Sequence, residues 1–392
     1  MARSPLLLAL FAPMMAAALD PPGEECRDRF LWPFAAQSIW NTPLGANATY
    51  EVLELFPNKT VHGGHGLPTL IQIDPDTLVR SSASDPLTPW FNQGGWSNVD
   101  HCNITQPAPI TNISFPYNLT QDVGNGNNAF SILQPDNRTL IQTQPLYRCG
   151  AGTPVLSRYQ LEDGSNYCAH EYPNEVDILG NGTLGAHGGS GLSAMGGTVR
   201  RGELVPGAPP IRHALKIEFY GAMWYWGSSR LQAQSHQNCG NAQYYPPAIN
   251  SDDGTYKCTC FGCCDYQGPS PFVAPGALLA IPPSVNASTS SALAQLKHPV
   301  ARQLRDAAIQ FGAYLVDSSS GYANKVSFCM EAGVDDEIVE HYNVSMAFPH
   351  GVAGHQDLYL ELLVVLQNLH AVTGNRTVGE PLAPPPPAIC GV

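Results

Sequence analysis

The clearest strand signal in the chain is a nine-residue alternation of apolar and polar side chains, Ile211-Arg212-His213-Ala214-Leu215-Lys216-Ile217-Glu218-Phe219. A period of two is typical of a β-strand, whose successive side chains point to opposite faces of a sheet. This interpretation places His213 with the apolar side chains, where it is as well explained by burial as by catalysis. It places Arg212 and Lys216 on the polar face, where they would line a groove.

Short alternations of the same kind occur at 69–73, 129–133 and 278–281, each bounded by Gly, Pro, Asn or Asp. With 37 Gly and 35 Pro in 392 residues, the chain has few long helical patterns. A helix is predicted over 299–311, followed by a strand at 313–316. The run 357–369 is predicted as a second helix, although its apolar centre also suits a buried strand. We therefore expect a mainly β fold, a β-sandwich or jelly-roll-like single domain with one or two helices in its C-terminal third.

The chain begins with features of an exported protein. Arg3 precedes an apolar run that ends in small residues before a Pro- and Gly-containing turn, so residues 1–19 are predicted to be a signal peptide. Residues 20–380 are predicted to form the β-rich secreted domain, with a Cys-rich excursion at 238–268, and residues 381–392 a Pro-rich tail. No later segment has the roughly 18 uninterrupted apolar residues of a membrane helix, so no membrane anchor is expected.

Glycosylation signals agree with export. The motif Asn-x-Ser/Thr occurs ten times, at Asn47, Asn58, Asn103, Asn112, Asn118, Asn137, Asn181, Asn286, Asn343 and Asn375. Each is a candidate for an N-linked glycan on a surface loop. The expected location is extracellular.

Eleven cysteines in an exported chain indicate a disulfide framework with one thiol left over. Cys26 and Cys390 lie near the two ends of the mature chain and are candidates to be linked. A dense group at 258–264 is better explained by disulfides than by zinc, because it has only one Cys-x-x-Cys knuckle.

The charge distribution limits the choice of partner. The net charge is −13, from 19 basic and 32 acidic residues, which argues against nucleic-acid binding. Four basic residues are nevertheless concentrated between 200 and 216, namely Arg200, Arg201, Arg212 and Lys216. This local positive patch suits an anionic small group or polymer.

Chemistry-bearing residues are densest in the glycine-rich stretch 185–204, which contains His187, two arginines of the patch and Glu203. Glycines allow close backbone approach and expose amides, although tight turns alone also explain them. The pair His62 and His65 in a second glycine loop is a weaker candidate metal site and is not favoured, and no cofactor or metal is expected. Neither His-Glu-x-x-His nor Gly-x-Ser-x-Gly occurs, so a zinc hydrolase or a nucleophile elbow lacks its motif.

Several segments together resemble a poorly characterised family of exported microbial proteins. They are Ser38-Ile39-Trp40-Asn41-Thr42-Pro43, Gly188-Gly189-Ser190-Gly191-Leu192-Ser193, Gly196-Gly197-Thr198-Val199-Arg200, Gly202-Glu203-Leu204, Arg212-His213-Ala214-Leu215 and Gly312-Ala313-Tyr314-Leu315-Val316-Asp317. The similarity spans most of the mature chain. It implies a carbohydrate-active export.

A second similarity is to jelly-roll polysaccharide lyases of the alginate-lyase type, through the order Arg201-Gly202-Glu203-Leu204, Arg212-His213 and Tyr314. The Gln that precedes the histidine in those lyases is absent here. A lyase acting on uronic acids neutralises the carboxylate, removes the adjacent proton and protonates the leaving oxygen, tasks that suit Arg, His and Tyr. The candidate catalytic residues are His187, Arg201, Glu203, Arg212, His213 and Tyr314, and the candidate substrate-binding residues are Trp40, Arg200, Lys216 and Trp224.

The expected function is that of a secreted carbohydrate-active protein that acts on or binds an extracellular polysaccharide, with a polyuronate lyase as the first candidate enzyme. The alternatives are a non-catalytic glycan-binding wall or matrix protein, and a glycoside hydrolase or esterase. A hydrolase would use a pair of carboxylates, among which Glu203 is a candidate.

Overall fold

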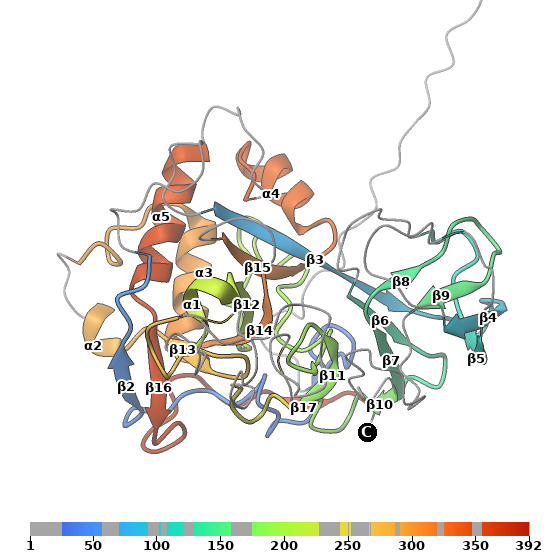
Figure 1. Cartoon of the computed structure of the whole chain (residues 1–392), viewed down its shortest axis with the longest axis horizontal. Helices are drawn as coiled ribbons and strands as arrows, with labels where there is room; N and C mark the ends of the chain where they lie inside the picture. The colour runs from blue at the N-terminus through green and yellow to red at the C-terminus, as the bar shows by residue number, and fades with distance from the viewer. Residues whose placement is uncertain are drawn as a thin grey trace, which may run out of the picture.

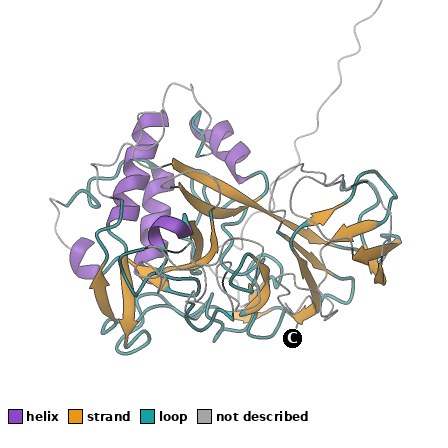
Figure 2. Cartoon of the chain, viewed as in Figure 1, coloured by secondary structure: helices purple, strands orange, loops and turns teal. Residues whose placement is uncertain are grey.

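The structure, a computed structural model, describes residues 26–56, 70–92, 102, 108–120, 129–157, 175–226, 244–249, 251, 266, 268–286, 291–319, 325–346 and 355–391. The predicted signal peptide, the His62/His65 pair and the cysteines of the 238–268 segment lie outside these residues. The described chain is mainly β, as the sequence predicts (Figure 2).

Ten strands form the central sheet (Figure 1). In spatial order they are β10 (Glu175–Asp177), β7 (Thr139–Thr143), β6 (Phe130–Leu133), β3 (Leu70–Arg80), β15 (Lys325–Glu331), β12 (Leu215–Phe219), β14 (Ala313–Ser318), β13 (Leu278–Ala280), β16 (His370–Gly374) and β2 (Thr49–Val52). The strands predicted at 69–73, 129–133, 211–219, 278–281 and 313–316 are all present. Most ends agree within two residues, but β3 continues seven residues beyond its predicted end and β12 begins four residues later than predicted.

The central sheet is mixed. The pairs β3–β15, β12–β14 and β3–β6 are parallel, and the remaining neighbours are antiparallel. A separate four-stranded sheet contains β5 (Ala108–Ser114), β4 (Leu87–Asn92), β9 (Val155–Ser157) and β8 (Leu146–Tyr147). The predicted sandwich or jelly-roll layering of these sheets stays a prediction.

Helices α3 (Pro299–Gln310), α4 (Val334–Tyr342) and α5 (His355–Gln367) gather at one side of the central sheet, and two one-turn helices, α1 (Gly221–Trp224) and α2 (Pro283–Asn286), lie nearby (Figure 1). The helices predicted over 299–311 and 357–369 are confirmed as α3 and α5, but the expected number of one or two helices in the C-terminal third is too low, because α2 and α4 also lie there. Pro299 begins α3, and the His298 side chain accepts a hydrogen bond from the Val300 amide at its N-terminus.

One face of the central sheet packs against these helices. The alternate β12 residues Leu215, Ile217 and Phe219 enter the same apolar cluster as residues of α3, α4 and α5. Burial of their apolar surface stabilises the packing of the sheet against the helices. The apolar face predicted for β12 is therefore confirmed.

The opposite face of the same strands has an unusual number of polar side chains. Lys216 and Glu218 of β12 lie on it, as do Asp74 and Asp76 of β3, and all four are buried or nearly so. The glycine-rich segment that follows β11 (Leu184–His187) covers this face, since the Lys216 side chain donates to carbonyls at 193 and 194. The expectation that Lys216 lines an open groove is therefore wrong, because this side chain is covered and only 1% exposed.

The chain ends are joined. Cys26 and Cys390 form a disulfide, as predicted, and the flanking β1 (Cys26–Arg27) pairs with β17 (Ala388–Ile389). A second disulfide links Cys102 and Cys149, and Cys329 is a buried free thiol. Among the described residues no helix is both long enough and apolar enough to cross a bilayer.

Candidate functional site

Two glutamines of the β7 region hold the glycine-rich segment in place. Gln142 accepts hydrogen bonds from the Ser193 hydroxyl and the Ala194 amide, and Gln144 accepts one from the Gly188 amide. Gly188 has a φ of +53°, and a Cβ there would lie 2.1 Å from the Asp317 carboxyl carbon. Only glycine therefore permits the close approach of this segment to the end of β14.

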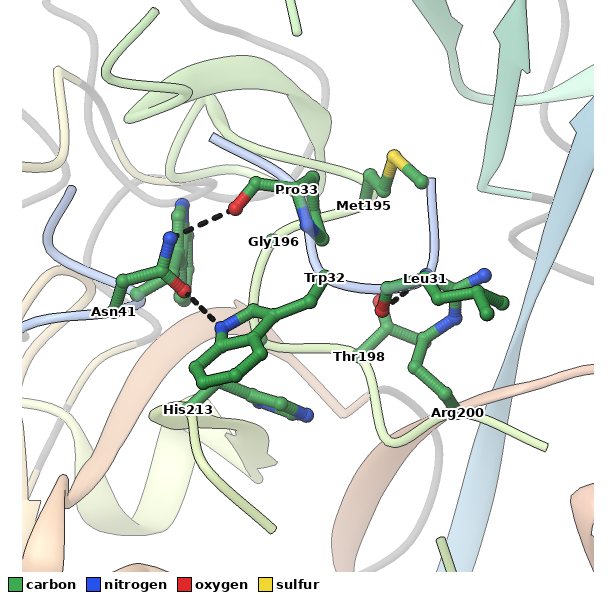
Figure 3. A pocket seen from close by; sticks show the side chains of 11 residues that line it. Leu31, Trp32, Pro33, Asn41, Met195, Gly196, Thr198, Arg200 and His213 are labelled. Carbon is green, nitrogen blue, oxygen red and sulfur yellow. Dashed lines mark hydrogen bonds between the residues drawn. The ribbon is translucent and has the colours of Figure 1, made fainter. Parts of the chain in front are cut away.

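A small surface pocket lies where this segment meets the N-terminal chain (Figure 3). We call it the Trp32 pocket; it is lined by Leu31, Trp32, Pro33, Trp40, Asn41, Met195, Gly196, Gly197, Thr198, Arg200 and His213. Its volume is about 10 Å³, room for about one water molecule. Three residues predicted from the sequence, Trp40, Arg200 and His213, thus come together at one place.

The Trp32 ring is the half-buried aromatic side chain of this pocket, whereas Trp40 is fully buried. Its Nε1 donates to Asn41 Oδ1 at 2.9 Å, and the Asn41 amide donates to the Pro33 carbonyl at 2.7 Å, so the indole is held in one orientation (Figure 3). The Arg212 guanidinium carbon lies 4.6 Å from the centre of the Trp32 ring, within cation–π distance. Both side chains are half-buried and keep contact with solvent.

His213 forms a buried pair with Glu203. Its Nε2 lies 3.2 Å from Glu203 Oε2, and its Nδ1 lies 2.9 Å from the Ala214 carbonyl oxygen. Burial by itself disfavours the imidazolium, but the Glu203 carboxylate and these two hydrogen bonds outweigh it and raise the pKa of His213. Both ring nitrogens face acceptors, so the arrangement favours a proton on each and leaves no nitrogen free to act as a base.

The two arginines of the glycine-rich segment have different environments. Arg200 is buried, and it donates to Glu331 Oε2 at 2.8 Å and to the Phe30 carbonyl at 2.6 Å. Arg201 is exposed and lies 3.1 Å from Glu337 Oε1. Arg201 is not among the residues that line the Trp32 pocket.

The remaining aromatic candidates are buried. Trp40 is 1% exposed, donates from Nε1 to the Gly182 carbonyl and packs edge-on against Tyr314, with ring centres 5.3 Å apart. The Tyr314 hydroxyl accepts from Arg376, and burial raises its pKa. Trp224 packs against Phe56 in the apolar core. In this structure Tyr314 and Trp224 are core residues rather than surface groups.

His187 and Lys216 lie instead on the buried polar face of the sheet. Lys216 Nζ is 2.9 Å from Asp76 Oδ2, and the Thr198 hydroxyl donates to the same oxygen at 2.6 Å. His187 Nε2 is 3.2 Å from the other Asp76 oxygen. Despite complete burial, Lys216 and His187 lower the pKa of Asp76. Thr198 also lines the Trp32 pocket, so the pocket and this face lie on two sides of the same segment.

Further acidic groups lie beside Asp76. Asp74, Glu218 and Asp317 come from β3, β12 and β14, and the Cys329 thiol of β15 lies 3.9 Å from Glu218 Oε1. We call these residues the buried polar cluster. Its members are Asp74, Asp76, His187, Lys216, Glu218, Asp317 and Cys329. Burial, followed by the charges of Asp74 and Asp317, raises the pKa of Glu218 well above its usual range. Four residues each place one donor atom within 4.8 Å of the others, and such a set is able to hold a metal ion. They are Asp74, His187, Glu218 and Cys329.

This cluster is only partly visible in the sequence. The alternation puts Lys216 and Glu218 on one strand face, but by itself it indicates an open groove there rather than a covered face. Asp74 and Asp76 continue the strand predicted at 69–73, and their spacing of two puts them on one face. No local pattern reveals their meeting with His187, because β3 and β11 are far apart in the chain.

Comparison with family models, with curated proteins and with solved structures found no match to this chain.

Proposed function

We propose that this protein is secreted and binds an acidic extracellular polysaccharide through the Trp32 pocket and its rim. The observation that supports this most directly is the stacking of Arg212 on the Trp32 ring, next to the His213–Glu203 pair. The Arg212 guanidinium suits a uronate carboxylate, and the part of the half-buried Trp32 ring left uncovered by Arg212 and Arg27 would contact the apolar side of the sugar ring.

The charge of this rim differs from that of the whole chain. The chain has a net charge of −13, yet the rim presents the half-buried Arg212 guanidinium, while the charge of His213 is balanced by Glu203. A fixed local positive charge on an acidic protein selects anionic ligands over neutral ones, and its contribution weakens as salt increases. The pocket is too small to enclose a sugar, so the polymer would lie across it and make further contacts outside.

Binding is better supported than the lyase chemistry. A lyase needs a free base, whereas both His213 nitrogens face acceptors, and it needs an accessible acid, whereas Tyr314 is 2% exposed. The geometry therefore favours a non-catalytic glycan-binding protein over a lyase. Export is supported by the seven acceptor asparagines whose side chains the structure describes, all of which are exposed: Asn47, Asn112, Asn118, Asn137, Asn181, Asn343 and Asn375.

The test is a binding measurement with purified protein on polygalacturonate, alginate and neutral glucans at two salt concentrations. We expect the polyuronates to bind and the neutral glycans to bind at least about tenfold more weakly, which corresponds to about 1.4 kcal/mol. Arg212→Ala should weaken polyuronate binding by a similar factor with little change in melting temperature. Arg138→Ala is the matched control, because Arg138 is an exposed arginine paired with Asp177.

Two results would count against the proposal. One is equal binding by the wild type and Arg212→Ala, and the other is equal binding of charged and neutral glycans. The same samples are assayed for unsaturated ends and for reducing ends. Unsaturated ends would restore the lyase interpretation, and reducing ends without them would indicate a hydrolase.

A further inference from the structure

The buried polar cluster contains more acidic groups than cationic partners. Four carboxyl groups, Asp74, Asp76, Glu218 and Asp317, occupy it together with Lys216 and His187. Lys216 forms an ion pair with Asp76 and donates hydrogen bonds to two backbone carbonyls. Uncompensated charge in a protein interior is costly, so Asp74 and Glu218 need either protons or a cation, whereas Asp317 accepts hydrogen bonds from the Gly189 and Ser318 amides.

The His187 side chain indicates independently that a cation, rather than protons, balances these carboxyl groups. The side chain is 0% exposed, and its Nδ1 has no hydrogen-bond partner among the described residues. Its Nε2 lies 3.2 Å from Asp76 Oδ1 and 3.8 Å from Asp74 Oδ2. Asp74 Oδ2 also lacks a hydrogen-bond partner in the described part of the chain. Most buried polar atoms in proteins have a partner, and a bound ion or water would supply one for these two residues.

We propose that Asp74, His187, Glu218 and Cys329 bind a divalent transition-metal ion, with zinc as the preferred occupant. Their donor atoms lie within 4.8 Å of one another, and the four residues come from strands β3, β11, β12 and β15. Two ligands that each lie about 2.0–2.3 Å from a zinc ion are separated by about 3–4 Å, so small side-chain movements would complete a tetrahedral shell.

The donor types select the class of metal. One imidazole, one thiol and two carboxyl groups form a mixed nitrogen, sulfur and oxygen set, which suits zinc, whereas calcium and magnesium prefer oxygen alone. Binding would displace the proton of the Cys329 thiol, because the thiolate is the ligand form. This site is separate from the Trp32 pocket and does not depend on the glycan proposal.

The proposal is tested on full-length protein secreted from a eukaryotic host without a histidine tag. After dialysis against metal-free buffer, elemental analysis should find near-stoichiometric zinc. Chelation should lower the melting temperature, and added zinc should restore it. His187→Gln and Asp74→Asn should lose the metal, whereas His213→Gln, a substitution of a buried histidine outside the cluster, should retain it.

A spectroscopic measurement covers the case in which those variants do not fold. Cobalt added to chelated wild-type protein should give visible d–d bands and a thiolate-to-cobalt charge-transfer band, and Cys329→Ala should lack only the charge-transfer band. Folded wild type with no bound metal and no response to zinc or cobalt would overturn the proposal and show that protons neutralise the cluster. Metal retained by both folded ligand variants would place it elsewhere and would equally overturn it.

Discussion

At the scale of single residues, the His213–Glu203 pair makes folding stability depend on pH. The pKa of His213 is raised above its usual value of 6.5 in the folded chain. The charged pair therefore contributes fully to stability below about pH 6.5, and the contribution is lost as the pH rises through the folded-state pKa. We expect the melting temperature of the wild type to fall over this interval and that of His213→Gln to fall less. Parallel pH profiles of the two proteins would contradict the assignment.

Residue roles are predictable where the chemistry is local. Arg212 and His213 are neighbours in sequence, and both reach the Trp32 pocket or its rim. The role of Trp32 cannot be predicted from the sequence. Nothing in its local sequence indicates that Asn41 will fix its ring beside Arg212, some 180 residues away. The same limit applies to Asp74, whose partners lie on three distant elements.

At the scale of elements, the segment after β11 depends on glycine at a defined position. Gly188→Ala would force a residue with a Cβ into a left-handed conformation and against the Asp317 side chain. We expect a loss of about 2 kcal/mol or more in the free energy of unfolding, measured by urea denaturation. Gly207→Ala is the control, since Gly207 has a φ of +80° but a Cβ added there would meet no atom within 4 Å. Its cost should be limited to about 1–2 kcal/mol of backbone strain. Equal losses would show that the contact with Asp317 is unimportant.

Element types are well predicted by the sequence and element ends less so. The alternation over 211–219 indicates nine strand residues, but the strand begins at Leu215 because the Ala214 amide donates to the Trp40 carbonyl, outside the sheet. The run 357–369 is ambiguous by composition. Burial of Leu358, Leu362 and Val365 at helical spacing explains why it folds as α5.

At the scale of the whole molecule, the disulfide between Cys26 and Cys390 constrains the unfolded chain strongly. It spans 364 residues, against 47 for the Cys102–Cys149 pair. Replacing both cysteines of the longer pair with serine should cost about 2–5 kcal/mol of stability, and the shorter pair about 2 kcal/mol less in the chain-entropy account. Urea denaturation of the two double variants checks the order, and the reverse order would contradict it.

The strand order is beyond the reach of the sequence. A β-rich composition and the strand positions follow from local patterns, but the order β3-β15-β12-β14 joins segments far apart in the chain. Its parallel pairs, β3–β15 and β12–β14, require long connections, and the length of these connections allows many orders. The buried polar cluster exists only because of this order.

The joined chain ends have a consequence for survival in a protease-rich medium. Because Cys26 and Cys390 are bonded and β1 pairs with β17, the described domain is topologically a closed ring. A single cut in any connecting segment between them opens the ring without releasing a fragment. Nicked protein would therefore migrate as one species on a non-reducing gel and as two after reduction, and the strands on either side of the cut would remain tethered at high effective concentration.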